Sequence, residues 1–417
     1  MQTVNLTNEE TTSRRITVID ALRGFALLGV ILMHALQHFG IYSGMRPEAQ
    51  FPVLDEAIQW LSQNVIMGRF INIFAFLFGL SFFIQMDRAA RKGIDFRKRF
   101  LWRMTILFVI GIIGNSFFTA DILCIYAVFG VLMVFLFPLK NWILIIIASL
   151  LILGTPRVIM ACYDKVVKTE QTDAQQQNTP ERPNRNMPPN PNMEKPSYFE
   201  SAKANLTTGL QGKLRYQFGM YGRGYITMAL FIMGLVVGRL RFFEGVQTTQ
   251  KRNVILFIGF ALLALVISLI LNVIPQEPLN FRMLMMPDFD ISFAMLAVTA
   301  LNDIQIIVFS GVLAMGFIVL YQIRSVGKYL DVLTPYGRMG LTNYEMQGVV
   351  GSIIFSMWGF GSIFGGWGTT EVFVLGLIIY IIQIIISKYW LKYFRYGPLE
   401  WLWRSGTYLE WQPLRKI

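Results

Sequence analysis

Ten apolar segments, each close to 20 residues long, restrict the folds that this chain can adopt. A segment of that length crosses the hydrocarbon core of a bilayer as an α-helix, in which the backbone polar groups are bonded within the segment. The sequence therefore predicts an all-α polytopic membrane protein, a bundle of about ten transmembrane helices. The segments lie near residues 17–39, 65–86, 100–117, 121–138, 141–159, 224–240, 253–273, 304–322, 337–357 and 371–391.

The composition fits a chain that lies mostly in lipid. Hydrophobic residues make up 54% of the chain and charged residues 15%, which departs from the usage of soluble domains. Residues 289–303 are also apolar, and the sequence leaves open an interfacial helix, a re-entrant piece or a long extension of the eighth span. A wrong choice there would move the C-terminus to the other side of the membrane.

Lys and Arg residues cluster at alternate junctions between the apolar segments. By the positive-inside rule these junctions face the cytoplasm, so ten spans put both the N-terminal tail, 1–16, and the C-terminal tail, 392–417, in the cytoplasm. The net charge of +12 is then the charge of loops beside anionic lipid, and it requires no nucleic-acid partner. The densest group contains Arg88, Arg91, Lys92, Arg97, Lys98, Arg99 and Arg103.

One long connection, residues 160–223, separates the five helices expected in 17–159 from the five expected in 224–391. Its part 171–196 is polar and rich in Pro, Asn and Gln, so we expect it to be disordered and external. Residues 198–221 have an amphipathic spacing that suits a helix on the membrane surface or across the end of the bundle. A covering lid and a solvated connector are both open at this point.

Two ionisable side chains share the first apolar segment. Arg23 and His34 are eleven residues apart, which is about 20° beyond three helical turns, so they leave the same face of a helix roughly 16 Å apart. Asp20 and His38 extend this stripe at both ends. An ionisable residue at membrane depth is costly and by default indicates a functional site.

Further polar side chains lie at membrane depth in other segments. Amides and hydroxyls often join helices there, and Asn72 is best interpreted in that way. A buried carboxylate such as Glu345 needs a partner, and Arg69, Arg23 and His34 are all candidates. The remaining members of this set are Asp121, Arg223, Arg338, Asn343 and Tyr344.

Other motifs indicate packing rather than chemistry. Cys124 and Cys162 lack the spacing of a metal or redox site, and no nucleotide-phosphate loop or serine-hydrolase elbow occurs in a suitable context. We therefore expect no bound metal. Gly234-x-x-x-Gly238 is typical of a close contact between two membrane helices.

Four segments together resemble the YeiB family of bacterial membrane proteins. They are 20–29, which begins Asp-Ala-Leu-Arg-Gly-Phe, 68–79, 337–344, and 396–405, which begins Tyr-Gly-Pro-Leu-Glu-Trp. The resemblance covers essentially the whole chain and implies a multi-pass protein of the bacterial plasma (inner) membrane. Because this family is defined by a domain of unknown function, for which transport is often suggested, the resemblance implies the fold more than the activity.

Arg23-x10-His34, preceded by Asp20, also resembles the signature of bacterial membrane acyltransferases that modify surface sugars. The Asp-x-x-Arg-Gly opening is similar to that of heparan-α-glucosaminide N-acetyltransferase. These resemblances imply that acetyl-CoA or another acyl-CoA is the co-substrate, that Arg23 helps to hold it, and that His34 is the catalytic histidine. We add Arg69 as a second candidate for donor binding and Glu345 as a second catalytic candidate.

Acyl transfer in such a protein would use an acceptor at the outer face, which would be an envelope glycan, a lipid or a small molecule. A homodimer is left open. The alternative function is a transporter, an exporter or a lipid-handling protein without acyl-transfer chemistry. That alternative requires a continuous polar path, with Arg23, Arg69, Asp121 and Glu345 along it.

Overall fold

The computed structural model describes residues 8–41, 49–171, 195–246, 249–280, 282–286 and 289–416, and these residues form helices joined by short connections. The helices are α1 (Asn8–Leu36), α2 (Pro52–Leu61), α3 (Arg69–Ala90), α4 (Arg97–Phe117), α5 (Leu123–Leu136), α6 (Asn141–Ile152), α7 (Thr155–Gln171), α8 (Tyr198–Ala204), α9 (Leu210–Phe218), α10 (Arg223–Arg239), α11 (Gln250–Val273), α12 (Phe293–Gln322), α13 (Arg324–Leu330), α14 (Leu333–Arg338), α15 (Gly340–Phe355), α16 (Gly361–Phe364), α17 (Thr369–Tyr393) and α18 (Pro398–Tyr408). The prediction of an all-α membrane protein is confirmed.

Each of the ten predicted apolar segments falls on a helix, but fewer helices than ten can cross a bilayer unaided. In the described part of the chain, six are long and apolar enough to do so, and two bent pairs raise the number to eight. The bends are 51° between α6 and α7 and 61° between the α8–α9 segment and α10. The count falls below ten because α5 has 14 residues and α15 has 16, shorter than the roughly 20 that a span needs.

Residues 289–303, for which the sequence left three choices, belong mainly to one long helix. α12 runs without interruption for 30 residues from Phe293 to Gln322, so this region is an extension of the eighth apolar segment. The Ser292 side chain begins the helix by accepting a hydrogen bond from the Met295 amide.

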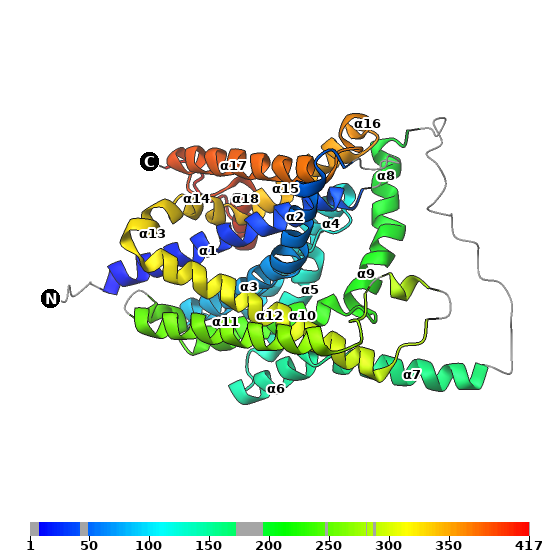
Figure 1. Ribbon diagram of the computed structural model, residues 1–417. Coiled ribbons are helices and arrows are strands. Elements are labelled where there is room, and N and C mark those ends of the chain that lie inside the picture. The colour runs from blue at the N-terminus through cyan, green and yellow to red at the C-terminus, as the bar shows by residue number, and fades with distance from the viewer. Residues whose placement is uncertain are drawn as a thin grey trace.

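The long helices run side by side, and the C-terminal residues lie at the same end of the bundle as the start of α1 (Figure 1). α18 packs at this end against the first turns of α4, where the Trp403 indole donates to the Arg103 carbonyl at 2.8 Å. Arg88 lies in the last turn of α3, and the loop between α3 and α4 carries Arg91 and Lys92. We call this the basic end of the bundle and the other the opposite end.

α8 and α9 run across the opposite end of the bundle, crosswise to the long helices (Figure 1). The Asn205 side chain, at the start of the π-helical segment Asn205–Gly209 between them, donates to the Ser116 carbonyl at 2.9 Å, and Asn115 donates to the Asn205 carbonyl at 3.2 Å. The amphipathic segment predicted at 198–221 therefore covers the end of α4. Most of 171–196, which the sequence predicts to be disordered, lies outside the described residues.

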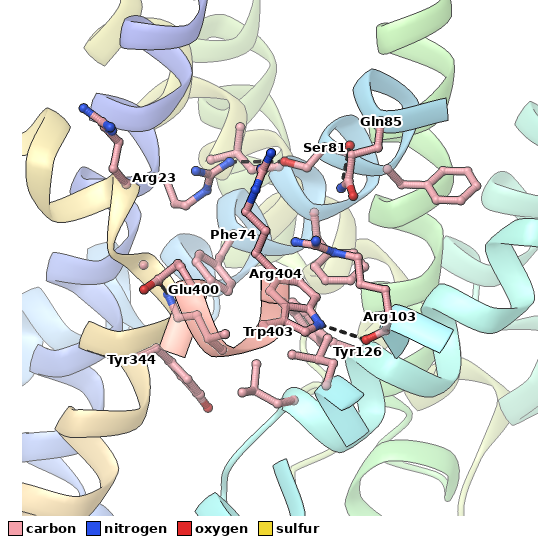
Figure 2. Close-up of a pocket in the computed structure, with 18 of the residues that line it drawn as sticks. Arg23, Phe74, Ser81, Gln85, Arg103, Tyr126, Tyr344, Glu400, Trp403 and Arg404 are labelled. Atoms are coloured by element: carbon pink, nitrogen blue, oxygen red, sulfur yellow. Dashed lines mark hydrogen bonds between the residues drawn. The ribbon is translucent and has the colours of Figure 1, made fainter. Parts of the chain in front are cut away.

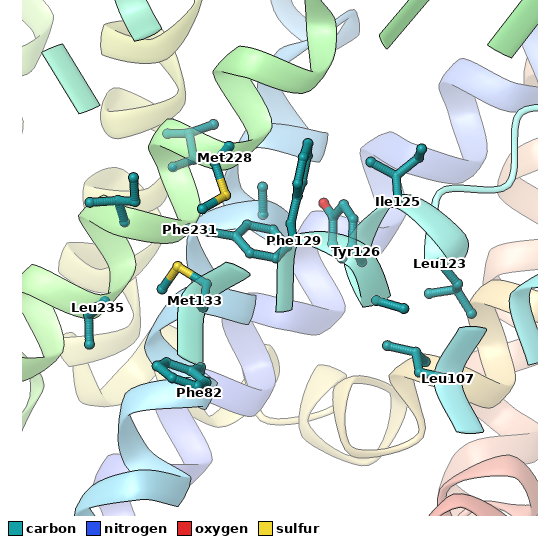
Figure 3. Packing of buried hydrophobic residues seen from close by; sticks show 14 of the residues in the cluster. Phe82, Leu107, Leu123, Ile125, Tyr126, Phe129, Met133, Met228, Phe231 and Leu235 are labelled. Carbon is teal, nitrogen blue, oxygen red and sulfur yellow. The ribbon is translucent and has the colours of Figure 1, made fainter. Parts of the chain in front are cut away.

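The centre of the bundle is a core of aromatic and aliphatic side chains, among them Phe82, Tyr126, Met133 and Phe231 (Figure 3). Next to it, α3 and α10 approach each other closely through glycines. A side chain at Gly234 would collide with the Phe76 carbonyl. The glycine motif predicted as a packing face is such a face, because small residues let two membrane helices make close backbone contact.

We expect Gly234→Leu to destabilise the fold by about 1–3 kcal/mol or more, because the added atoms must push α3 and α10 apart. The matched control is Gly259→Leu on α11, where nothing lies within 4 Å of an added Cβ. Thermal unfolding of both variants in the same detergent measures the difference. Equal melting temperatures for the two variants would contradict this account of the α3–α10 contact.

Candidate functional site

A cavity of about 280 Å³ lies at the basic end, between α1, α3, α4, α15 and α18 (Figure 2). Its wall combines arginines with aromatic side chains. The lining residues are Arg23, Phe74, Leu77, Phe78, Ser81, Phe82, Gln85, Phe100, Arg103, Met104, Leu107, Leu123, Tyr126, Gly337, Arg338, Gly340, Leu341, Tyr344, Tyr396, Glu400, Trp403 and Arg404. Among the candidate site residues from the sequence, Arg23, Arg338 and Tyr344 are part of this wall.

Arg23 is held on the cavity wall by two polar side chains. One guanidinium nitrogen donates to the Asp20 carboxylate at 2.7 Å, three residues earlier on α1, and another donates to the Ser81 hydroxyl on α3 at 3.1 Å. The spacing of three residues puts Asp20 and Arg23 on one helix face, as the sequence predicts. The ion pair lowers the cost of a charge in this position and fixes the orientation of the guanidinium group.

Glu400 is the acidic residue on the cavity wall, and its oxygens are already bonded. It accepts from the Leu341 and Thr342 amides at 2.7 and 3.0 Å and from the Thr342 hydroxyl at 2.6 Å. These amides belong to the first turn of α15, which otherwise leaves them unbonded. Burial raises the pKa of the Glu400 carboxyl, while the hydrogen bonds from Thr342 act in the opposite direction. The residue therefore joins α18 to the start of α15.

Tyr344 lies between the cavity and His34. It lines the cavity one turn further along α15 than Gly340, and it lies below the arginines in Figure 2. Its hydroxyl accepts a hydrogen bond from the Ile122 amide, next to Asp121, at 3.0 Å. Its ring centroid lies 6.3 Å from that of His34.

His34 is buried, with 3% of its surface exposed, in a group of aromatic rings. Phe118 meets it edge-on at a centroid distance of 4.7 Å, and its Nδ1 has no hydrogen-bond partner among the described residues. The second histidine is different. His38 lies after the end of α1, and its Nε2 bonds with the Trp367 carbonyl at 3.0 Å.

Glu345 lies near Asp121 and Lys213, and their charges act on it. Glu345 Oε1 and Asp121 Oδ1 have no hydrogen-bond partner in the described part of the chain. Lys213 extends from α9, across the opposite end, and donates to the Asn115 side chain at 2.8 Å. The sequence suggested Arg69, Arg23 or His34 as the partner of Glu345, and it gave no role to Lys213, because nothing local indicated that α9 would bury a lysine against α4.

Arg69 and Arg223 lie apart from the cavity, near the start of α3. Arg69 donates to the Gln63 and Met67 carbonyls at 2.5 and 2.8 Å, and Arg223 donates to the Gly68 carbonyl at 3.0 Å and to the Asn72 side chain. Irregular backbone at membrane depth needs such partners. Arg69 is twelve residues from Ser81, the contact of Arg23, which is about 18 Å along α3. The structure therefore does not bring Arg69 to Arg23.

Asn343 joins three helices rather than facing the cavity. Its side chain donates to the Tyr336 carbonyl on α14 at 3.0 Å and to the Ser387 hydroxyl on α17 at 2.9 Å. Of the residues that the transport alternative requires along one path, the cavity wall contains Arg23 but not Arg69, Asp121 or Glu345.

The fold and the cavity define a class: a multi-pass helical membrane protein with an arginine-lined cavity at its basic end. Residues 237–410 match the model of a family described as "Protein of unknown function (DUF418)". This match covers less than half of the chain, and it supports the resemblance to the YeiB family that the four segments indicate.

Three similar proteins carry the description "uncharacterized" in their names. The chain is 26% identical to "Uncharacterized protein YxaH" of Bacillus subtilis (strain 168) over 97% of each chain. It is also 26% identical to an "Uncharacterized 39.9 kDa protein in amylase 3'region" of Bacillus acidopullulyticus, over 94% of each chain. "Uncharacterized protein YeiB" of Escherichia coli (strain K12) is 35% identical over 80 residues, 19% of this chain and 20% of YeiB. No solved structure matches the chain.

Proposed function

We propose that this protein transfers an acyl group from a cytoplasmic acyl-CoA, with acetyl-CoA the first choice, to an acceptor near the opposite end. The position of Tyr344 carries the proposal. This residue lines the cavity that contains Arg23, and its ring lies 6.3 Å from that of His34. A donor whose thioester passes Tyr344 would bring its carbonyl carbon to the histidine.

The chemistry needs one base and one path for the leaving group. The hydroxyl or amine of the acceptor attacks the thioester carbonyl, the C–S bond breaks, and the new ester or amide bond forms. His34 takes the proton from the acceptor and returns it to the thiolate of coenzyme A, so that the free thiol leaves. Among the described residues no donor occupies the Nδ1 of His34, which supports this role, because a general base needs a free nitrogen.

Glu345, Asp121 and Lys213 are our candidates for the acceptor side of the reaction. They come from different elements near the opposite end. Asp121 Oδ1 and Glu345 Oε1, which have no partner in the described part of the chain, can accept hydrogen bonds from hydroxyl or amino groups. Acceptors of the classes already considered, an envelope glycan, a lipid or a small molecule, carry such groups. The proposal assigns the basic end to the cytoplasm of a bacterial inner membrane, with both tails inside, in agreement with the positive-inside rule.

Calorimetric binding of acetyl-CoA to the detergent-purified protein tests the donor half of this proposal. We expect saturable binding by the wild type and by His34→Ala, and binding weaker by about tenfold to 100-fold in Arg23→Ala, because a hydrogen bond to a charged group contributes about 1.5–3 kcal/mol. Arg23→Lys should restore little of the loss if the planar guanidinium is required. Absence of binding by the wild-type protein would remove the donor and with it the proposed function.

A further inference from the structure

Three arginines at the cavity come from three different elements, and the sequence gave a ligand role to none of them. They are Arg103 on α4, Arg338 on α14 and Arg404 on α18. In the described part of the chain, none of the three forms an ion pair with a carboxylate. Arg23 is paired with Asp20, and the hydrogen bonds of Glu400 are taken by the first turn of α15. The cavity wall therefore has an excess of positive charge.

Aromatic faces hold two of these guanidinium groups in position. The central carbon of the Arg103 guanidinium lies 3.6 Å from the centroid of the Trp403 ring, and that of Arg404 lies 5.1 Å from Tyr396 and 5.5 Å from Tyr408. A guanidinium group that contacts an aromatic face keeps its N–H groups at the edge, where they can bind an oxyanion. The arrangement fixes the orientation of the cations without neutralising them.

Two nitrogen atoms in this group need an acceptor. The Nε atoms of Arg103 and Arg404 are buried and have no hydrogen-bond partner among the described residues. A buried cationic donor without a partner is costly, and a negatively charged group in the cavity would remove that cost. Arg338 is exposed, so an anion can reach the group from solution.

We infer that Arg103, Arg338 and Arg404 form a phosphate-binding site for a ligand with a phosphate-bearing end and an apolar or extended remainder. Phosphate fits because arginine binds its oxygens in a bidentate manner. The apolar wall, with Phe74, Phe78 and Tyr126, suits the remainder of the ligand. About 280 Å³ holds only part of such a molecule, so the phosphates lie at the arginines near the surface.

The phosphate site itself is inferred from the arginines. Only the identification of its ligand with the phosphate end of the acyl donor rests on the proposed function, which it extends. The site also gives a role to the Tyr-Gly-Pro-Leu-Glu-Trp segment, which carries the family resemblance. That segment begins α18 and supplies Tyr396 and Glu400 to the cavity, followed by Trp403 and Arg404. A phosphate-bearing lipid headgroup has the same chemistry as a soluble phosphate, and the experiment must separate these two sources.

The experiment measures binding of three soluble probes to the full-length protein in a neutral detergent: coenzyme A, pantetheine, which lacks phosphates, and inorganic pyrophosphate. We expect the wild type to bind coenzyme A at least about tenfold more tightly than pantetheine, and pyrophosphate to compete with coenzyme A. Arg103→Gln and Arg404→Gln should each weaken coenzyme A binding about tenfold and leave pantetheine binding unchanged. The matched control is Arg99→Gln, because Arg99 also lies over an aromatic ring, Tyr408 at 5.1 Å, but does not line the cavity.

A second arm uses nanodiscs of zwitterionic lipid with and without phosphatidylglycerol. Binding of phosphatidylglycerol that depends on Arg103 and Arg404, with no binding of the soluble probes, would assign the phosphate site to a lipid headgroup. The inference is overturned if coenzyme A and pantetheine bind the wild type equally and pyrophosphate does not compete, a comparison that needs no variant to fold. Coenzyme A binding that depends on the arginines, without acyl transfer, would keep the phosphate site and reject the proposed function. Acyl transfer by the wild type, with coenzyme A binding unchanged in Arg103→Gln and Arg404→Gln, would keep the proposed function and reject the phosphate site.

Discussion

His34→Ala should lower acyl transfer by about 100-fold to 10,000-fold, whereas His38→Ala should leave it close to the wild-type rate. A positioned general base contributes a factor of this size, and alanine cannot replace it. The control is close, because His34 and His38 are the two histidines of the chain and are four residues apart. The Nε2 of His38 is occupied by the Trp367 carbonyl, while the Nδ1 of His34 has no partner among the described residues.

The assay follows release of coenzyme A thiol from acetyl-CoA by membranes that contain each variant, with envelope extract as the source of acceptor. Tryptophan fluorescence during thermal unfolding checks that both variants are folded. Full activity of a folded His34→Ala protein would exclude the histidine as the base and leave Glu345 or Asp121 to be tested in its place. A large loss in both variants would indicate instead that the aromatic group around the end of α1 needs its packing intact.

Arg157→Met should destabilise the protein by about 3–5 kcal/mol, because it leaves Asp303 buried without its partner. The two side chains form an ion pair of 2.5 Å and are 3% and 13% exposed, and Arg157 also donates to the Tyr221 carbonyl at 2.6 Å. This arginine thereby joins α7, α12 and the break before α10. The double variant Arg157→Met with Asp303→Leu should recover much of the loss, since a buried ion pair is often replaced by apolar side chains at little cost.

Denaturation in mixed detergent micelles measures this series. The comparison pair is Arg97 and Asp95, which are 3.0 Å apart with both side chains more than half exposed, and its removal should not change unfolding measurably. A single Arg157→Met variant as stable as the wild type would mean that Asp303 finds water or another donor. A double variant no better than the single one would instead assign the loss to the hydrogen bond with Tyr221.

The helices were predictable from the sequence because hydropathy is a local property. The proximity of Asp20 and Arg23 was predictable for the same reason, because two residues three positions apart on one helix lie on the same face. The helix ends were harder to predict, as α5 and α15 show. Hydropathy locates an apolar segment, but it does not give the residues at which the helix begins and ends. The sides on which the tails lie, and the external position of 171–196, stay predictions.

The composition of the site was not predictable, because it depends on which helices become neighbours. Arg23 and Arg69 were grouped since both are arginines at membrane depth, but α1 and α3 are antiparallel and the two residues belong to different ends. Arg103 belongs to the basic cluster that the positive-inside rule explains as a topological signal, and only the packing of α18 on α4 gives it a cavity. Lys213 likewise becomes significant only when α9 crosses the bundle.

The hydrogen bonds that hold the α8–α9 segment have a kinetic consequence. The Ser116 and Phe117 carbonyls, which accept from Asn205, are among the last of α4, and a helix leaves its final carbonyls without intrahelical donors. Water at the membrane surface can replace the asparagine at such carbonyls, so each bond resists separation by only about 0.5–1.5 kcal/mol. Detachment of the segment also breaks the Lys213–Asn115 and Asn115–Asn205 hydrogen bonds, and it is a local fluctuation that leaves α4 intact. In the proposed orientation, with the basic end in the cytoplasm, the frequency of that fluctuation would set how often a molecule from outside meets Glu345.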